Sequence, residues 1–144
     1  MMTENKKKYN IVSEFVKDIS FETPTVETYI YVKDSIAKYK LKIDINSKKI
    51  KNKIIEVNIV LKLNDESSEK KRSYFEMTYT SIISIEENIS DKKDLEKMVL
   101  IDIPNEVYPR IENLFSTILD KSGFKGVGIN KKIDFEALYK TRKN

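Results

Sequence analysis

The stretch KDISFETPTVETYIYVKDS, from Lys17 to Ser35, begins with the alternating pattern of a β-strand, and the alternation then stops. Ile19 and Phe21 alternate with polar residues, as in a strand with one buried face. Four apolar residues then stand in a row, from Tyr29 to Val32. We interpret residues 22–36 as a long connection from a first strand to a second, whose apolar residues either anchor the connection or line an open groove.

Four segments of the chain alternate apolar and polar residues with period two, which predicts four strands. Short polar connections, residues 46–53 and 64–72, join the second, third and fourth strands into an antiparallel meander. Because the long connection precedes this meander, we expect a Greek key with strand order 1-4-3-2. The apolar positions are Tyr9, Ile11, Phe15, Ile19 and Phe21; Ala37, Tyr39, Leu41, Ile43 and Ile45; Ile55, Val57, Ile59, Leu61 and Leu63; and Phe75, Met77, Tyr79, Ile83 and Ile85.

Helical patterns replace the strands after residue 85. Ser90 or Asp91 is placed to cap a short helix through Leu100, which Pro104 should end.

A longer amphipathic helix is expected from Asn105, with Gly123 placed to terminate it. Asp134 is placed to cap a last short helix, from Phe135 to about Arg142. Strands followed by helices predict an α+β fold, with the long helix covering one face of the sheet. The length of 144 residues fits a single domain over residues 1–144.

The formal charge of +4 is concentrated at the two ends of the chain. Residues 1–10 carry +2 and residues 139–144 carry +3, so residues 11–138 carry −1. This distribution favours a Lys-rich protein with flexible, solvated tails at 1–8 and 141–144. The alternative is a Lys-rich nucleic-acid-binding module, whose affinity would fall steeply with salt.

The chain contains neither histidine nor cysteine. Their absence excludes disulfides, thiolate nucleophiles, histidine bases and Cys/His zinc sites. Gly126-Val127-Gly128 follows a helix instead of opening a strand–turn–helix unit, so a loop explains it better than a phosphate site. We therefore expect no enzyme, no cofactor and no bound metal.

The two outer strands of the expected sheet have unpaired edges, and an exposed edge invites pairing with another chain. The first strand is the candidate for that pairing, because Val12 and Val16 make it apolar on parts of both faces. We therefore expect an oligomer. No signal peptide follows the basic residues 1–8, and no run reaches the ~18–20 apolar residues that cross a bilayer. A cytoplasmic protein without membrane insertion is expected.

Several motifs resemble one known family along nearly the whole chain. KDISFETP at Lys17–Pro24 is similar to the first-strand motif of the SecB family of export chaperones. IPNEVYPRIENLFSTILDKSGF at Ile103–Phe124 resembles the family's long helix, and IDFEALY at Ile133–Tyr139 its C-terminal motif. Shorter matches are KD at Lys33-Asp34 and ISI at Ile83–Ile85.

The resemblance implies a homotetramer, a dimer of dimers, that holds unfolded precursor proteins without ATP and delivers them to the motor SecA. It also implies site residues at matching positions. For the client-binding groove these are Phe21, Tyr29, Ile30, Tyr31 and Val32, and for the SecA-binding surface Asp18, Glu22, Tyr74 and Glu76. For the tetramer interface they are Phe75, Met77 and Tyr79.

The chain departs from the family's pattern in its net positive charge, since members are usually acidic. A second alternative within the family stays open, a SecB-like chaperone dedicated to one client such as an antitoxin.

Overall fold

The computed structural model describes residues 8–65, 72–86, 91–127, 129 and 132–143. Strand β1 (Tyr9–Glu22) is followed by helix α1 (Val26–Ser35) and the short 3-10 turn η1 (Ile36–Lys38). Strands β2 (Lys40–Lys51), β3 (Ile54–Asn64) and β4 (Tyr74–Ile85) come next. The chain ends with α2 (Lys92–Lys97), the π-helical turn η2 (Met98–Asp102), α3 (Ile103–Lys121) and α4 (Phe135–Lys143).

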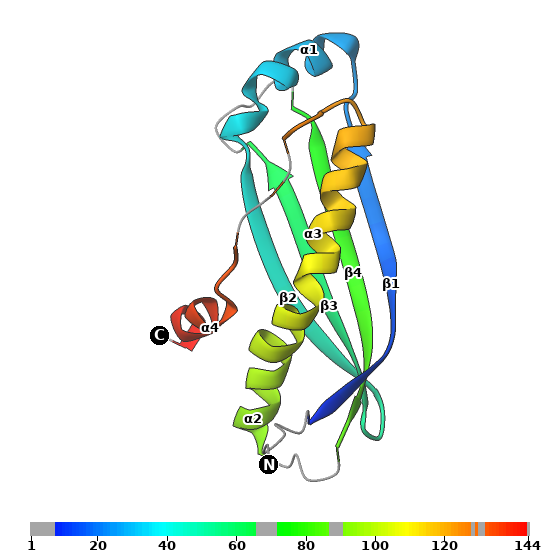
Figure 1. Ribbon diagram of the computed structural model, residues 1–144, viewed down its shortest axis with the longest axis vertical. Coiled ribbons are helices and arrows are strands. Elements are labelled where there is room, and N and C mark those ends of the chain that lie inside the picture. Colours follow the sequence, from blue (N-terminus) through cyan, green and yellow to red (C-terminus); the bar gives the residue numbers. More distant parts are fainter. Residues whose placement is uncertain (1–7, 66–71, 87–90, 128, 130–131, 144) are drawn as a thin grey trace, which may run out of the picture.

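The four strands form one antiparallel sheet in the order β1-β4-β3-β2, which confirms the predicted Greek key (Figure 1). Strands β1 and β2 are its two outer strands. Directly paired residues share a face of the sheet, as Phe21 and Phe75 do, or Ile45 and Ile59. The alternation read from the sequence therefore assigns the two faces correctly along β3 and β4.

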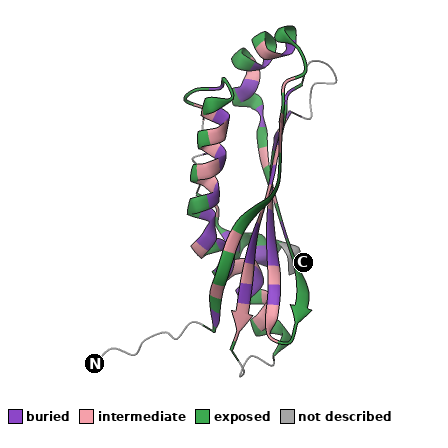
Figure 2. Ribbon diagram, turned by 90° about the vertical axis from the view of Figure 1, so that its right-hand side faces the viewer, coloured by how far each residue is buried: buried purple, intermediate pink, exposed green. Residues whose placement is uncertain are grey.

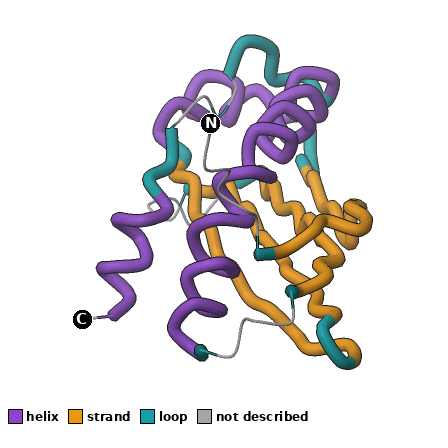
Figure 3. Tube along the Cα trace, turned by 60° about the horizontal axis from the view of Figure 1, so that its bottom comes forward, coloured by secondary structure: helices purple, strands orange, loops and turns teal. Residues whose placement is uncertain are grey.

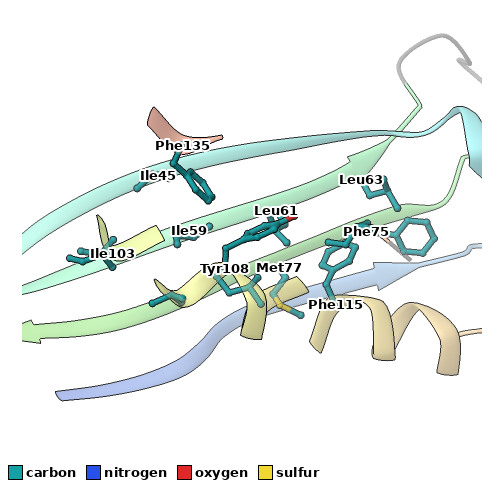
Figure 4. Packing of buried hydrophobic residues seen from close by; sticks show 14 of the residues in the cluster. Ile45, Ile59, Leu61, Leu63, Phe75, Met77, Ile103, Tyr108, Phe115 and Phe135 are labelled. Atoms are coloured by element: carbon teal, nitrogen blue, oxygen red, sulfur yellow. The ribbon is translucent and has the colours of Figure 1, made fainter. Parts of the chain in front are cut away.

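Helix α3 covers one face of the sheet (Figures 1 and 2), and the helices gather on that side (Figure 3). Phe115 of α3 is fully buried, and its ring lies 5.0 Å from that of Phe21. Burying such a side chain contributes about 1.5–3 kcal/mol. Figure 4 shows the same layer from close by, with Met77, Leu61 and Ile59 beneath the helix. No described helix lies along the opposite face in Figure 2.

The hairpin between β2 and β3 is tighter than predicted. Residues 46–51 belong to β2, and only Asn52 and Lys53 connect the strands. Lys53 has a φ of 63°, in the left-handed region that two-residue hairpin turns require. The polar residues in this segment suggested a loop, but they lie on an exposed edge strand.

Strand β1 changes register with β4 twice, between Ile11 and Ser13 and between Val16 and Asp18. Each irregularity adds one residue to β1, which reverses the faces to which the following side chains point. This explains why Val12 and Val16 broke the alternation in the sequence.

The predicted long connection is largely a helix, which the sequence analysis did not foresee. The Thr25 hydroxyl accepts a hydrogen bond from the backbone N–H of Thr28 at 3.0 Å and so caps α1. The helix then runs into η1, so β2 begins at Lys40, and Ala37 and Tyr39 lie outside the strand where they were expected.

The two helices predicted on either side of Pro104 are continuous. The Ile103 N–H donates to the Met98 carbonyl, five residues back, in the wider π-helical turn. Proline lacks an N–H and crowds the preceding turn, and this local widening accommodates Pro104 at the start of α3. The prediction that Pro104 ends a helix is therefore wrong.

The predicted ends of the later helices are confirmed. Gly123, with a φ of 105°, follows the end of α3, and Asp134 Oδ1 accepts a hydrogen bond from the Ala137 N–H at 3.0 Å. Helix α4 extends to Lys143, so residues 141–143 continue a helix where a tail was expected. The expected N-terminal tail lies mostly outside the described residues.

Candidate functional site

The predicted groove residues on α1 point in different directions. Successive residues of a helix are about 100° apart, so four in a row cannot line one groove. Val32 is 0% exposed in the core, whereas Ile30 is 59% and Tyr31 45% exposed. The prediction treated this segment as a connection that places all four residues in one groove, and the helix corrects it: Val32 is structural, while Ile30 and Tyr31 face outward.

Phe21 and Tyr29, two further predicted groove residues, also anchor structure. The ring of Phe21 lies 5.2 Å from Phe75, on the core side of β1. The Tyr29 hydroxyl donates to the Gly123 carbonyl at 2.8 Å, and its ring lies 5.3 Å from Phe124. Tyr29 thus fastens α1 to the end of α3.

The four residues predicted for SecA binding lie together on the uncovered face of the sheet. Glu22 pairs with Tyr74 across β1 and β4, and Asp18 lies four residues along the same face. The Tyr74 hydroxyl donates to the Glu76 carboxylate, and this hydrogen bond, burial and the charges of Glu76, Glu22 and Asp18 raise the pKa of Tyr74 to about 12. The arrangement is an exposed acidic surface with a phenol at its centre.

The residues predicted for the tetramer interface lie beneath α3. Phe75 is 1% and Met77 0% exposed, because they face the helix and not a second copy. Neither is available to another subunit while α3 stays in place. Tyr79 is half-buried, and its hydroxyl donates to Glu14 Oε1 at 3.0 Å. Phe75 and Met77 therefore provide no exposed surface for a second copy.

Strand β1 offers such a surface. Its exposed apolar side chains are Val12, Phe15, Val16 and Ile19. Two polar contacts hold the same strand to α3. Arg110 donates to both carboxylate oxygens of Glu14, at 2.9 and 2.7 Å, and the Tyr9 hydroxyl donates to Glu106 Oε1 at 2.7 Å. The β1 edge therefore exposes apolar side chains to solvent and is held to α3 by polar contacts.

The opposite edge of the sheet is hollowed. A cavity of about 520 Å³ lies between β2, α2, η2 and α4, and a second of about 380 Å³ continues along β2. Both are lined by Ile45, Leu100 and Tyr139, so they form one groove, which we call the β2 groove. Figure 1 shows α4 beside β2 at this edge, and in Figure 4 Phe135 of α4 points toward Ile45.

The lining of the β2 groove is mainly apolar. It includes Ile43, Ile45, Leu95, Val99, Leu100, Leu138 and Tyr139, with Lys92, Glu96 and Asp44 among the polar members. Helix α4 is positioned by its Asp134 cap and by Phe135, whose ring lies 5.6 Å from that of Tyr108. Concave surfaces that combine apolar side chains with polar groups are typical of binding sites.

The sequence analysis missed the β2 groove, although it had noted the residues. Ile43 and Ile45 were interpreted as the buried face of a strand, and Leu138 and Tyr139 as part of a motif. A usable signal was present in α4. Phe135 and Tyr139 share one helical face, and Leu138 lies beside it, 46% exposed.

In the described part of the chain, no group of His, Cys, Asp and Glu side chains is arranged to hold a metal ion. No helix within that part is long and apolar enough to cross a membrane.

Comparison with known proteins gives the family. Residues 2–144 match the family model described as preprotein translocase subunit SecB. The chain belongs to the SecB family. A SecB protein-export protein of Pelagibacter ubique is 52% identical over 143 residues, which cover 99% of this chain and 100% of the relative. The SecB protein of Methylocella silvestris is 26% identical, over 92% of this chain and 81% of that protein.

The fold also has a solved SecB-like counterpart. A Mycobacterium tuberculosis SecB-like chaperone, solved in complex with a peptide from an antitoxin, superposes with a TM-score of 0.64 at 10% identity. The superposition covers 87% of this chain and 91% of that one.

Membership of the SecB family establishes the class of function. The chain is a chaperone of protein export that binds client proteins, and SecB proteins are holdases without enzymatic activity. The comparisons give no support to the nucleic-acid-binding alternative.

Proposed function

We propose that the β2 groove is where this SecB protein holds apolar stretches of unfolded export precursors. The observation that carries the proposal is the groove between β2 and the helices, in which Ile43 and Ile45 of β2 lie opposite apolar side chains of α2, η2 and α4, with Leu138 and Leu100 accessible at its wall. An extended client would reach from the groove to the exposed Ile30 and Tyr31 on α1. Once one stretch of a client is bound, the other stretches bind at a high effective concentration, so several weak contacts give a high overall affinity. Such binding needs no ATP.

We further propose that β1 forms the contact between subunits of a homotetramer, a dimer of dimers. A second copy of β1 would cover Val12, Phe15, Val16 and Ile19, since an apolar, unpaired edge strand favours pairing. Phe75 and Met77 would act indirectly, by holding α3 against the sheet.

The acidic surface is our proposed contact with SecA in the cytoplasm. Asp18, Glu22 and Glu76 surround Tyr74 on the uncovered face of the sheet, on the other side from α3. Positive patches on a partner would be attracted to it, mainly through faster association. Clients and motor would then occupy separate surfaces and could be bound together.

An aggregation assay tests the proposal. It measures, without ATP, the chaperone concentration that prevents an unfolded, slowly folding precursor from aggregating. Leu138→Asp places a charge in the β2 groove and should raise the chaperone concentration needed for protection about tenfold, because the charge must be desolvated by an apolar client. Phe15→Ala, made on the opposite edge, is the control and should change the protection per assembled subunit little. Equal protection by wild type and Leu138→Asp would exclude the groove.

A chaperone dedicated to one client is the second candidate. It is favoured by the fold shared with the mycobacterial chaperone that was solved with an antitoxin peptide. The 52% identical relative is named an export protein, which supports the general role. Protection of several unrelated precursors would favour export, and protection of a single one the dedicated role.

A further inference from the structure

The uncovered face of the sheet, opposite α3 (Figure 2), has a basic half on β2 and β3. The residues of β2 that point to this face alternate with the apolar residues Leu41, Ile43 and Ile45. Before the register shift near the hairpin they are Lys40, Lys42, Asp44, Asn46 and Lys48, all exposed, with a formal sum of +2. On β3 the same face carries Glu56 and Lys62, whose charges cancel.

The other half of the uncovered face lies on β1 and β4 and contains the acidic surface. Asp18, Glu22 and Glu76 contribute −3. Lys17 reaches across the same face to the Glu56 carboxylate of β3 and brings the sum to −2. The uncovered face is thus divided into an acidic half of −2 and a basic half of +2.

The two halves meet between β4 and β3. Lys62 Nζ of β3 lies 3.5 Å from Glu76 Oε1 of β4, and Lys62 pairs with Lys42 of β2. Glu76 is therefore followed across the sheet by two lysines in one row. Two residues further along the strands, Glu22 stands on the outer strand β1 and Lys40 on the outer strand β2. The charge thus changes sign across the strands.

Internal contacts do not remove this separation of charge. Lys42 and Lys62 already interact with other groups of the chain, but both are exposed, so their charges act on a partner that covers them. Lys40 is exposed as well. The sums of −2 and +2 already include the carboxylates Asp44 and Glu56 on the basic half.

A protein that docks on the acidic surface must also cover the basic half. Neighbouring strands lie about 4.8 Å apart, so β2 is about 10 Å from β4. An interface of standard size buries about 800 Å² on each partner, which corresponds to a patch about 28 Å across. The distance between the halves is also close to one Debye length at 0.1 M salt, so both act on the partner. A wholly basic partner would therefore be repelled by the lysines of β2.

We propose that the uncovered face docks a protein surface of mixed charge, with basic groups opposite the acidic surface and carboxylates opposite Lys40 and Lys42. The inference rests on the proposed contact of the acidic surface with SecA, and it states the chemistry that SecA presents there. Lys40 and Lys42 determine specificity in two ways. They fix the orientation of the partner, since a reversed orientation brings like charges together, and they disfavour proteins that are only basic.

Charge reversal on β2 tests the inference through the sign of its effect. Biolayer interferometry measures binding of SecA from the same organism to the full-length protein. At about 50 mM salt, Lys40→Glu with Lys42→Glu should bind about fivefold more weakly than wild type, and at about 0.5 M salt the difference should fall below about twofold. A wholly basic partner predicts tighter binding, because the reversal replaces repulsion by attraction. Unchanged or tighter binding would refute the inference.

A matched control separates the uncovered face from net charge. Lys33→Glu with Lys49→Glu changes the net charge equally at two exposed positions. Lys33 lies on α1, and Lys49 pairs with Ile55 and so points to the α3 side of β2. This control should stay within about twofold of wild type. If it loses as much affinity as the reversal of Lys40 and Lys42, net charge is responsible, and the inference is wrong.

Zero-length crosslinking of the wild-type complex tests the same contact without a substitution. A carbodiimide joins a lysine amine to a carboxylate that touches it. Mass spectrometry should find links from Lys40 or Lys42 to carboxylates of SecA, and links from the acidic surface to lysines of SecA. Links from the acidic surface alone would refute the inference and leave the proposed SecA contact intact.

Reversal of the acidic half distinguishes failure of this inference from failure of the proposed function. Asp18→Lys with Glu22→Lys should weaken SecA binding about tenfold at about 50 mM salt. If this variant binds like wild type, or if wild type does not bind SecA, the proposed SecA contact fails, and with it the inference. If it binds weakly while Lys40→Glu with Lys42→Glu binds normally, only the inference fails.

Discussion

The two outer strands of the sheet have unpaired edges, and they differ in the side chains that they carry there. Strand β1 carries exposed apolar side chains and is clamped to α3 by the Glu14–Arg110 pair. Strand β2 carries lysines at Lys40 and Lys42 and again near its end, at Lys48, Lys49 and Lys51, and beside it lies the β2 groove. An apolar edge favours pairing with another strand, whereas lysines along an edge oppose it.

This difference is the basis of our proposal that the two edges bind different partners. A rigid, apolar strand suits a partner of fixed shape, such as a second copy of the chain. Lysines along β2 disfavour pairing of its backbone with another strand. The groove beside β2 therefore suits a segment that binds reversibly through its side chains. In this proposal one sheet supports assembly at its β1 edge and client binding at its β2 edge.

The largest predicted effect is on the free energy of unfolding, compared between a buried and an exposed phenylalanine. Phe75→Ala removes a fully buried ring beneath α3 and should lower the free energy of unfolding by about 3–5 kcal/mol. Phe15→Ala, at a position 44% exposed on β1, should lower it by less than about 1 kcal/mol at a concentration where the protein is monomeric. Urea unfolding followed by circular dichroism measures both.

The same pair of variants should reverse in order when assembly is measured. Sedimentation should show Phe15→Ala dissociating at higher concentrations than wild type, because it removes apolar contact area at the proposed interface. Unchanged assembly in Phe15→Ala would remove β1 as the contact between subunits.

A smaller effect is expected at the clamp between β1 and α3. Arg110→Ala removes both hydrogen bonds to Glu14 and should cost about 1 kcal/mol of unfolding free energy. Lys62→Ala is a matched control, since both cations have 46% side-chain exposure but Lys62 makes one contact to Glu76 at 3.5 Å. The control should cost less than about 0.5 kcal/mol. Equal losses in thermal unfolding would mean that the clamp adds nothing specific.

The smallest effect concerns the phenol in the acidic surface. Because the pKa of Tyr74 is raised to about 12, its stabilising contribution is complete below pH 10 and is lost between about pH 10 and 12. Glu76→Gln removes the charged hydrogen-bond acceptor and should bring the pKa of Tyr74 back toward 10. NMR titration of ¹³C-labelled tyrosine resolves this residue from the others. A pKa that stays near 12 in the variant would show that Glu76 is not the cause.

The sheet could be predicted from the sequence because strand alternation and connection length are local features. Period two along β3 and β4 assigned the buried face, and one long connection among short ones was enough for the strand order. The helix in that connection was missed because α1 has apolar residues on several sides. The cap at Thr25 is a local signal for this helix, whereas the burial of Val32 shows the contribution of tertiary packing.

The candidate site was harder to predict. The residues of the acidic surface came from the resemblance to the SecB family, and alternation agrees with them, since Asp18, Glu22 and Glu76 occupy the polar positions of two paired strands. The β2 groove depends on where α4 comes to rest, and the sequence sets no local constraint on that placement. Leu138 and Ile45 are 93 residues apart and meet only in the folded chain.

Site-specific photo-crosslinking tests the division between the two edges most directly. A benzophenone side chain would replace Leu138 in the β2 groove or Phe15 on β1, and each variant would be illuminated with a labelled unfolded precursor. We predict that position 138 crosslinks to the precursor and position 15 to a second copy of the chain. Precursor crosslinks at position 15 with none at position 138 would contradict the account.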